Sequence, residues 1–208
     1  MKQQKLSSYK KDQALRSAKN HGGQLSKGKA KRKRPLAPNT WMHFVFKSSV
    51  AKGAFSLLNP RHRFAIQKLI QQQARQHFVI IKDGVNMGNH LHLQIKFKNP
   101  DLLRRFLRII TGRIAMLVTG ARKGRSVTQI LKRKAVRFWD ELCYSRIVKS
   151  SFEVRQLSGY LQANRIERQQ GYQARQKFLQ NFNKKVSALK SAIKNELSDF
   201  VFGVTLTA

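Results

Sequence analysis

The segment Asn89-His90-Leu91-His92-Leu93-Gln94-Ile95-Lys96-Phe97 alternates strictly between polar and apolar side chains. Successive side chains of a β-strand point to opposite faces, so this alternation predicts a strand with one apolar and one polar face. The apolar face is expected to pack against a hydrophobic core. The polar face carries the imidazoles of His90 and His92 on the same side, and such a pair can share one metal ion.

The composition points to a polyanionic partner. The chain has 208 residues, 41% of them hydrophobic, which is enough for one domain with extensions. Its net charge of +34 favours nucleic acid as the partner, with an anionic membrane surface as the weaker alternative. Only nine acidic residues are present, which argues against a two-metal nuclease built from clustered carboxylates. A metal site in this chain must therefore use neutral ligands.

Cysteine content and hydropathy narrow the class further. Cys143 is the single cysteine, so an internal disulfide and a cysteine-rich zinc module are both excluded. The sequence has no apolar N-terminal signal segment and no apolar run of 18 residues. We therefore expect a cytoplasmic, nucleoid-associated protein with no membrane partner.

The first 38 residues read as a basic arm without hydrophobic periodicity. Two interpretations stand side by side: a solvated, disordered segment, or an arm that grips phosphates and orders on nucleic acid. His21-Gly22-Gly23 within the arm has no explanation from composition. The basic run before Pro35 includes the candidate DNA-binding residues Lys31, Arg32, Lys33 and Arg34.

The remaining pattern predicts a mixed fold. Strands are expected at 40–48, 78–82, 89–98 and 136–148, and helices at 61–76, from 100 onward, at 152–168 and at 173–197. Asn59 is expected to cap the first helix, with Pro60 at its first position, and Asp83-Gly84 is expected to form a turn. The order predicts an α+β fold of the split βαβ (ferredoxin/RRM-like) type, an antiparallel sheet with helices on one face. The expected regions are an arm at 1–38, a catalytic domain at 39–168 and a basic helical extension at 169–208.

The helix that begins near residue 100 has an arginine-rich side. These arginines could form a solvated helix face or contact nucleic acid, and the total charge favours the second interpretation. The residues are Arg104, Arg105, Arg108 and Arg113.

A helix some seventy residues after the histidines offers the missing reactive groups. Tyr160 and Asn164 are four residues apart and therefore share one helix face. Tyrosine suits phosphoryl transfer because its phosphoester can be reversed by a returning 3′-hydroxyl. A packing role for Tyr160 is the competing interpretation, and Tyr9, Tyr144 and Tyr172 are the other tyrosines.

Two motifs resemble a known family. Met87-Gly88-Asn89-His90-Leu91-His92 resembles the signature of HUH transposases that carry one tyrosine, the insertion-sequence 200 type. Tyr160-Leu161-Gln162-Ala163-Asn164 resembles the tyrosine helix of the REP-associated tyrosine transposase branch, and the segment 138–148 resembles the strand before that helix. The resemblance covers about residues 40–167. It departs from many relatives at Gly88 and Arg165, where those relatives carry proline.

The resemblance implies a function and a set of roles. His90 and His92 would hold Mg²⁺ or Mn²⁺ together with Asn164. Tyr160 would attack single-stranded DNA near a hairpin, leaving a 5′-phosphotyrosine and a free 3′-hydroxyl, and strand transfer would reverse the step. Lys96 is a candidate for stabilising the charge that develops on the phosphate. Unpaired bases would stack on aromatic side chains of the sheet.

Three alternatives remain open from the sequence. The same fold could serve as a non-catalytic DNA- or RNA-binding protein, as an RNA-associated structural protein, or, least favoured, as a holder of structural zinc. The oligomeric state, monomer or homodimer, is also open, and in a dimer Tyr160 could complete the site of the partner.

Overall fold

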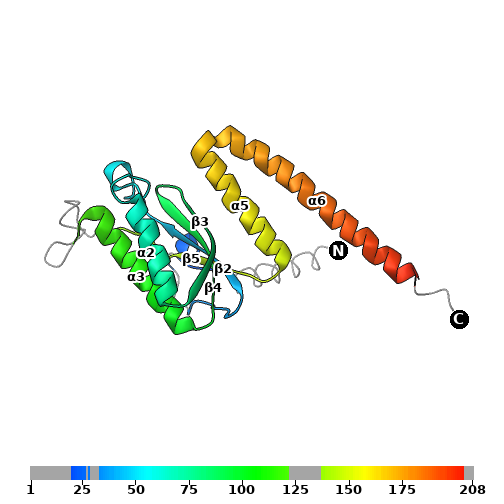
Figure 1. Ribbon diagram of the computed structural model, residues 1–208, viewed down its shortest axis with the longest axis horizontal. Coiled ribbons are helices and arrows are strands. Elements are labelled where there is room, and N and C mark those ends of the chain that lie inside the picture. The colour runs from blue at the N-terminus through cyan, green and yellow to red at the C-terminus, as the bar shows by residue number, and fades with distance from the viewer. Residues whose placement is uncertain (1–19, 27, 29–32, 122–136, 204–208) are drawn as a thin grey trace. The chain divides into compact units, whose positions relative to one another are not determined.

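The computed structural model of the chain describes residues 20–26, 28, 33–121 and 137–203 (Figure 1). Residues 122–136 and two of the candidate DNA-binding residues, Lys31 and Arg32, lie outside these ranges. The chain divides into two compact units, Met1–Leu157 and Ser158–Ala208. None of the described helices is both long and apolar enough to cross a membrane.

The first unit contains a five-stranded antiparallel sheet, so the predicted α+β fold class is confirmed. The strand order is β1-β5-β2-β4-β3, and every pair of neighbours is antiparallel. The strands are β1 (Asn20–His21), β2 (Trp41–Lys47), β3 (Val79–Asn86), β4 (His90–Phe97) and β5 (Tyr144–Val148). The unit also has two short 3-10 turns, η1 (Gly23–Ser26) and η2 (Gly53–Phe55).

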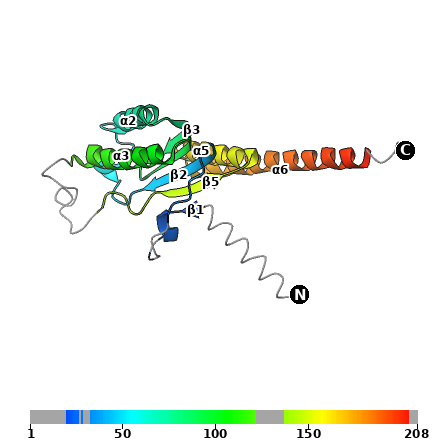
Figure 2. The same cartoon turned by 90° about the horizontal axis from the view of Figure 1, so that it is seen from below.

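Two helices cover one face of this sheet, α2 (Arg63–Gln76) and α3 (Pro100–Thr119). Figure 2 shows both on the same side of the strands. The apolar side chains of β4 point toward them, because Leu93, Ile95 and Phe97 join the buried core with Phe106 and Ile110 of α3. The predicted alternation of β4 therefore sends one set of side chains into the core and leaves the other set on the opposite face.

Helix α3 begins where the sequence predicts it. Asn99 caps it, with its side-chain oxygen accepting from the backbone amides of Asp101 and Leu102, and Pro100 occupies the first turn. The helix ends at Gly120, whose positive φ of 72° is accessible to glycine at little cost.

Two local predictions around α2 and β3 are wrong. Helix α2 begins at Arg63 rather than at Pro60, because the Asn59 side chain accepts from the Arg61 amide in a local turn instead of capping the helix. Asp83-Gly84 lies inside β3 rather than in a turn. The strand continues through it with an irregularity between Ile81 and Asp83, and the chain reverses at 87–89.

The predicted strand at 136–148 is too long. Only Tyr144–Val148 is strand, and 137–143 is irregular. The aromatic residues of this segment pack instead: Phe138 is buried, and the Trp139 indole N–H donates to the carbonyl of Thr111 at 2.9 Å. The many aromatic residues of this segment were interpreted as a strand, but they reflect packing against the core.

The N-terminal arm is partly ordered onto the sheet. Asn20 and His21 pair with Arg146 and Ser145 of β5. A Cβ added at Gly22 would lie 2.3 Å from the carbonyl oxygen of Cys143, so only glycine allows this approach of the two backbones. The His21-Gly22-Gly23 motif thus joins the arm to the edge of the sheet, and the interpretation of the whole arm as disordered is wrong for these residues.

Two long helices fill the C-terminal part of the chain, α5 (Ser151–Gln170) and α6 (Tyr172–Gly203). The second unit holds α5 from Ser158 onward and all of α6. Within it, a Cβ at Gly159 would lie 2.3 Å from the Phe182 ring, so this glycine lets the α6 aromatic approach α5 closely. An ion pair of 3.3 Å between Arg175 and Glu167 adds a polar contact.

Candidate active site

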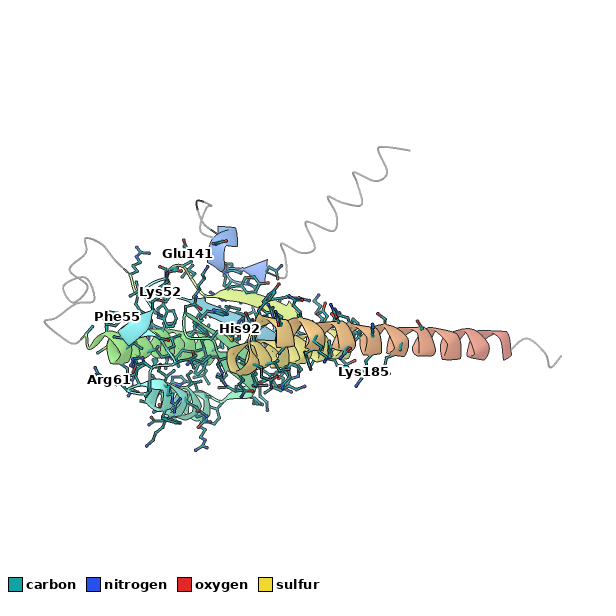
Figure 3. The ribbon with its side chains drawn as sticks, turned by 90° about the horizontal axis from the view of Figure 1, so that it is seen from above. Lys52, Phe55, Arg61, His92, Glu141 and Lys185 are labelled. Carbon is teal, nitrogen blue, oxygen red and sulfur yellow. The ribbon has the colours of Figure 1, made fainter. Side chains whose placement is uncertain are left out.

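The sheet face opposite α2 and α3 gathers imidazoles from two strands. His90, His92 and Gln94 follow one another on β4, and the register of β2 with β4 sets His43 opposite Gln94. We call these four residues the histidine face. Figure 3 shows the His92 side chain on the sheet, with Glu141 and α2 on opposite sides of the unit.

The two histidines of the motif lie next to each other. The ring centroids of His90 and His92 are 4.8 Å apart, with the ring planes at 80°. His90 Nδ1 lies 2.6 Å from Asn89 Oδ1. A carboxamide oxygen can only accept, so the His90 Nδ1 carries the proton and donates it, which in the neutral form of the ring leaves the lone pair on Nε2.

His92 has an imidazole as its neighbour. His43 Nε2 and His92 Nδ1 are 3.0 Å apart, within hydrogen-bond distance. Burial is the main cause that lowers the pKa of His43 to about 4, with the nearby Arg146 charge adding to it. Burial also lowers the pKa of His92 to about 3, helped by His43 and His90. Both rings are therefore neutral at pH 7, which is the form that binds metals.

Gln94 extends the face with a carboxamide that has no partner among the described residues. Its side chain is fully buried, and neither Oε1 nor Nε2 has a hydrogen-bond partner there. A buried polar group without a partner costs about 1–3 kcal/mol, so such a group marks a place where an ion, a water molecule or a substrate group can bind.

Lys96 lies on the same face but at its other end. It follows His92 by four residues along β4, which separates their Cα atoms by about 13 Å. Its ammonium group is 5.1 Å from the centre of the Trp41 ring, and that of Lys82 is 5.6 Å from it. The two lysines and the indole form a basic, aromatic patch at a distance from the histidine pair, so the predicted role of Lys96 beside the histidines stays a prediction.

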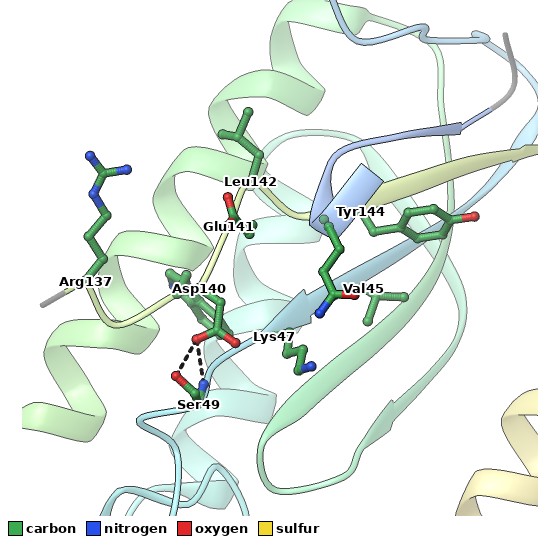
Figure 4. Close-up of a pocket in the computed structure, with 11 residues that line it drawn as sticks. Val45, Lys47, Ser49, Arg137, Asp140, Glu141, Leu142 and Tyr144 are labelled. Carbon is green, nitrogen blue, oxygen red and sulfur yellow. Dashed lines mark hydrogen bonds between the residues drawn. The ribbon is translucent and has the colours of Figure 1, made fainter. Parts of the chain in front are cut away.

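A wide pocket opens on the β5 side of this face, where Lys47 is one of the residues that line it (Figure 4). Its volume is about 940 Å³, and Val45, Lys47 and Tyr144 of the sheet line it together with Gln24 and Trp139. Lys47 pairs directly with His90 across the two strands. One wall is fixed by Asp140, whose carboxylate accepts from the amide (2.7 Å) and the hydroxyl (2.8 Å) of Ser49. The pocket therefore combines aromatic surface with a cation next to the histidine pair.

The predicted basic contacts are scattered. The α3 arginines are all exposed, on the helix that covers the other side of the sheet, and Arg104 pairs with Asp101. Lys33 is exposed, whereas Arg34 is partly buried: its guanidinium donates to the carbonyl of Cys143 at 2.8 Å and lies 5.6 Å from the Phe44 ring. A DNA contact by these residues stays a prediction, and Arg34 has a structural role as well.

Tyr160 and Asn164 belong to the second unit, where both lie on α5 as predicted. Their spacing of four residues places them on one side of that helix. Tyr160 is 37% exposed, and Asn164 is buried. The helix begins after Ser150, whose hydroxyl accepts from the Glu153 amide at 3.1 Å.

The donor set is unusual for a metal site. Among the described residues, no group of three or more His, Cys, Asp or Glu side chains could hold a metal ion. The histidine face instead offers neutral donors, namely imidazole nitrogens and the carboxamide oxygen of Gln94, which has no partner among the described residues. These donors are compatible with a divalent cation that takes its other ligands from oxygen atoms of substrate and water.

Parity in the sequence places Gln94 on this face with the two histidines, as the structure confirms, but sequence reasoning missed His43 as a member of the face and Asn89 as a partner of His90. Asn89 could have been found, because it directly precedes His90. His43 lies 49 positions before His92, and its strand also alternates, but only the register of β2 with β4 places the two rings together.

Comparisons with known proteins give only distant likenesses. No protein-family model matches the chain, and no curated protein matches it. A solved REP-associated tyrosine transposase bound to a REP hairpin is 12% identical, with a TM-score of 0.48, over 69% of this chain and 76% of that one. A provisionally assigned transposase from Deinococcus radiodurans R1 is 13% identical, with a TM-score of 0.39, over 65% of this chain and 98% of that one.

Proposed function

We propose that the protein cleaves single-stranded DNA in a metal-dependent reaction and rejoins it through a 5′-phosphotyrosine intermediate, as a transposase. The observation that carries the proposal is the His90–His92 pair on the sheet face that α2 and α3 do not cover, in a chain of net charge +34. Two imidazoles close to a pocket lined by Lys47 suit a phosphodiester bound through a cation.

His90, His92 and Asn164 would hold Mg²⁺ or Mn²⁺. The bound ion would act as a Lewis acid on a phosphate oxygen of the DNA. The protein's own contribution is to keep the buried His92 imidazole neutral, which leaves its ring able to bind a cation.

Tyr160 is the proposed nucleophile. The phenol gives up its proton to solvent, and its oxygen attacks the phosphorus and forms the phosphotyrosine ester. The bond from phosphorus to the 3′-oxygen breaks, and that oxygen takes up a proton from solvent and leaves as a 3′-hydroxyl. Strand transfer is the reverse reaction with another 3′-hydroxyl, so no external energy source is needed. Lys47, the cross-strand partner of His90, can offset charge on the phosphate.

The proposed substrate is single-stranded DNA next to a hairpin. The pocket beside His90 would receive an unpaired nucleotide against Tyr144 and Trp139, while Trp41, Lys82 and Lys96 would hold the strand farther along the face. The exposed arginines of α3 and the basic arm remain proposed contacts for the hairpin phosphates.

Incubation with hairpin-bearing oligonucleotides and Mn²⁺ tests the reaction. A denaturing gel should show a covalent protein–DNA band that requires the metal and disappears in Tyr160→Phe. Tyr172→Phe is the matched control, since Tyr172 is also an exposed tyrosine of the second unit, 61% exposed, and this variant should keep the band. A band that persists in Tyr160→Phe would move the nucleophile to another residue.

The competing function is DNA or RNA binding without chemistry. It predicts tight, chelator-insensitive binding and no cleavage across a broad pool of hairpin oligonucleotides. That outcome would overturn the proposed reaction and leave the basic sheet face as a binding surface.

Mixing two inactive variants tests how the site is assembled. His92→Gln and Tyr160→Phe should regain cleavage when combined only if one protomer supplies the tyrosine to the histidines of its partner. No recovery on mixing, with both variants folded, would assign the tyrosine to the histidines of the same chain.

A further inference from the structure

Both histidines of the pair are held at the same ring atom by different neighbours. Asn89 Oδ1 lies 2.6 Å from the Nδ1 of His90, and His43 Nε2 lies 3.0 Å from the Nδ1 of His92. One contact is made within the β4 motif and the other across the sheet from β2. Because both contacts are made at Nδ1, both rings are held with Nε2 directed away from these neighbours.

The geometry of the second contact is that of a hydrogen bond. The ring planes of His43 and His92 differ by only 14°, and their centroids are 5.2 Å apart. With the two nitrogens at 3.0 Å, the rings lie nearly in one plane and point edge to edge rather than overlapping face to face. One nitrogen must carry the proton and the other the lone pair, because a hydrogen bond between two ring nitrogens needs one donor and one acceptor.

The direction of this proton decides what His92 can do. If Nδ1 of His92 donates to His43, the lone pair of His92 is on Nε2, as it is in His90. If His43 donates instead, the Nε2 of His92 carries a proton and cannot coordinate a cation. Histidine ligands of metals regularly donate their second ring N–H to a neighbouring acceptor, which fixes the tautomer and the ring orientation.

We propose that His43 is a positioning residue that accepts the Nδ1 proton of His92, and so presents the Nε2 of His92, like that of His90, to a divalent cation. The inference rests on the metal-dependent function proposed above. His43 is not itself a ligand in this arrangement, because its Nε2 is occupied by the hydrogen bond. Its own proton is then on Nδ1.

Burial of His43 and His92 keeps their hydrogen bond intact. His43 is 8% exposed and His92 is 3% exposed, so water cannot readily replace either partner. Removal of His43 would leave the Nδ1–H of His92 without its acceptor and free the ring to turn. If His43 has only a packing role, there is no reason for His92 rather than His43 to donate in this hydrogen bond.

The test is a long-range ¹H–¹⁵N imidazole spectrum of the full chain without metal and without DNA. We expect the His92 signals to show a protonated Nδ1 and an unprotonated Nε2 in the wild type. His43→Gln, whose carboxamide oxygen can still accept, should keep this pattern, whereas His43→Leu should lose it. A protonated Nε2 on His92 in the wild-type protein would overturn the proposal.

Binding of Mn²⁺ alone supplies the second readout. We expect about 10- to 100-fold weaker binding in His43→Leu and near-normal binding in His43→Gln. His62→Leu is the matched control: His62 is also buried, and its ring contacts the carbonyl oxygen of Ser56 at the start of α2, away from the histidine face. Equal losses in His43→Leu and His62→Leu would assign the effect to stability and refute the positioning role.

These results separate the inference from the proposed reaction. The spectrum is recorded on protein that performs no chemistry, so the absence of DNA cleavage leaves its result unchanged. Conversely, an active enzyme with the opposite His92 tautomer would retain the proposed function and refute the role of His43.

Discussion

The two faces of β4 share a backbone and differ in almost everything else. On one face, Leu93, Ile95 and Phe97 are buried in the common core with α3. On the other, His92 and Gln94 are equally buried but polar, and the Gln94 amide has no partner among the described residues. Burial without hydrogen bonds costs free energy, so the first face accounts for stability and the second is expected to account for function.

The largest effect should come from the polar face. We expect His92→Gln to lower the rate of DNA cleavage on the order of 10³-fold, because loss of a ligand removes several kcal/mol of metal-assisted stabilisation of the transition state. The cleavage rate and the circular dichroism spectrum would be measured together. An unchanged rate in a folded variant would remove His92 from the site.

The neighbouring residue should give the opposite result. Leu93→Ala removes a buried side chain, 3% exposed, from the core, and we expect the free energy of unfolding to fall by about 2–5 kcal/mol. Urea denaturation measures the loss, and cleavage per folded molecule should stay near the wild-type value. A large loss of cleavage at full folding would mean that the two faces are not separable.

The buried imidazoles should also make stability depend on pH. The pKa values of His43 and His92 are lowered to about 4 and about 3, so the unfolded chain binds protons more readily than the folded chain below pH 6.5. Stability is therefore present in full above pH 6.5 and is lost as the pH falls toward 4 and below. We expect a loss on the order of 3 kcal/mol for each ring over that window in metal-free protein.

Substitution of both His43 and His92 tests whether these rings cause the pH dependence of stability. Nine acidic residues in 208 leave few carboxylates to contribute to acid denaturation. The double variant His43→Gln/His92→Gln should accordingly show a flatter dependence of unfolding free energy on pH. An unchanged slope would place the titrating groups elsewhere.

The smallest effect should concern a single phosphate contact. Lys47→Gln, beside His90, is expected to weaken binding of single-stranded DNA a few-fold and to reduce the slope of log affinity against log salt by about 0.7. The same titration with Arg113→Gln tests whether the α3 side of the sheet also contacts DNA. Equal effects of both substitutions would show that DNA binds both sides of the unit.

Local patterns predicted several elements well. The alternation of β4, the Asn99-Pro100-Asp101 start of α3 and the course of α5 and α6 all depend on interactions between residues close in sequence. Predictions failed where a distant contact overrode a local signal. Asp83-Gly84 became part of β3 because pairing with Gln94 and Leu93 outweighs its turn preference, and the aromatic segment before β5 packs into the core instead of forming a strand.

The sequence by itself determined that two imidazoles share one face of a strand and that Tyr160 and Asn164 share one side of a helix. Its net charge of +34 favours a polyanionic partner. Each of these follows from a short period or from composition. Only the tertiary structure decided that His43 meets His92, because that contact depends on the register between β2 and β4 across 49 positions of sequence. The two-residue repeat of a strand determines to which face of the sheet each side chain points. The pairing between strands determines which residue forms a hydrogen bond with each histidine ring.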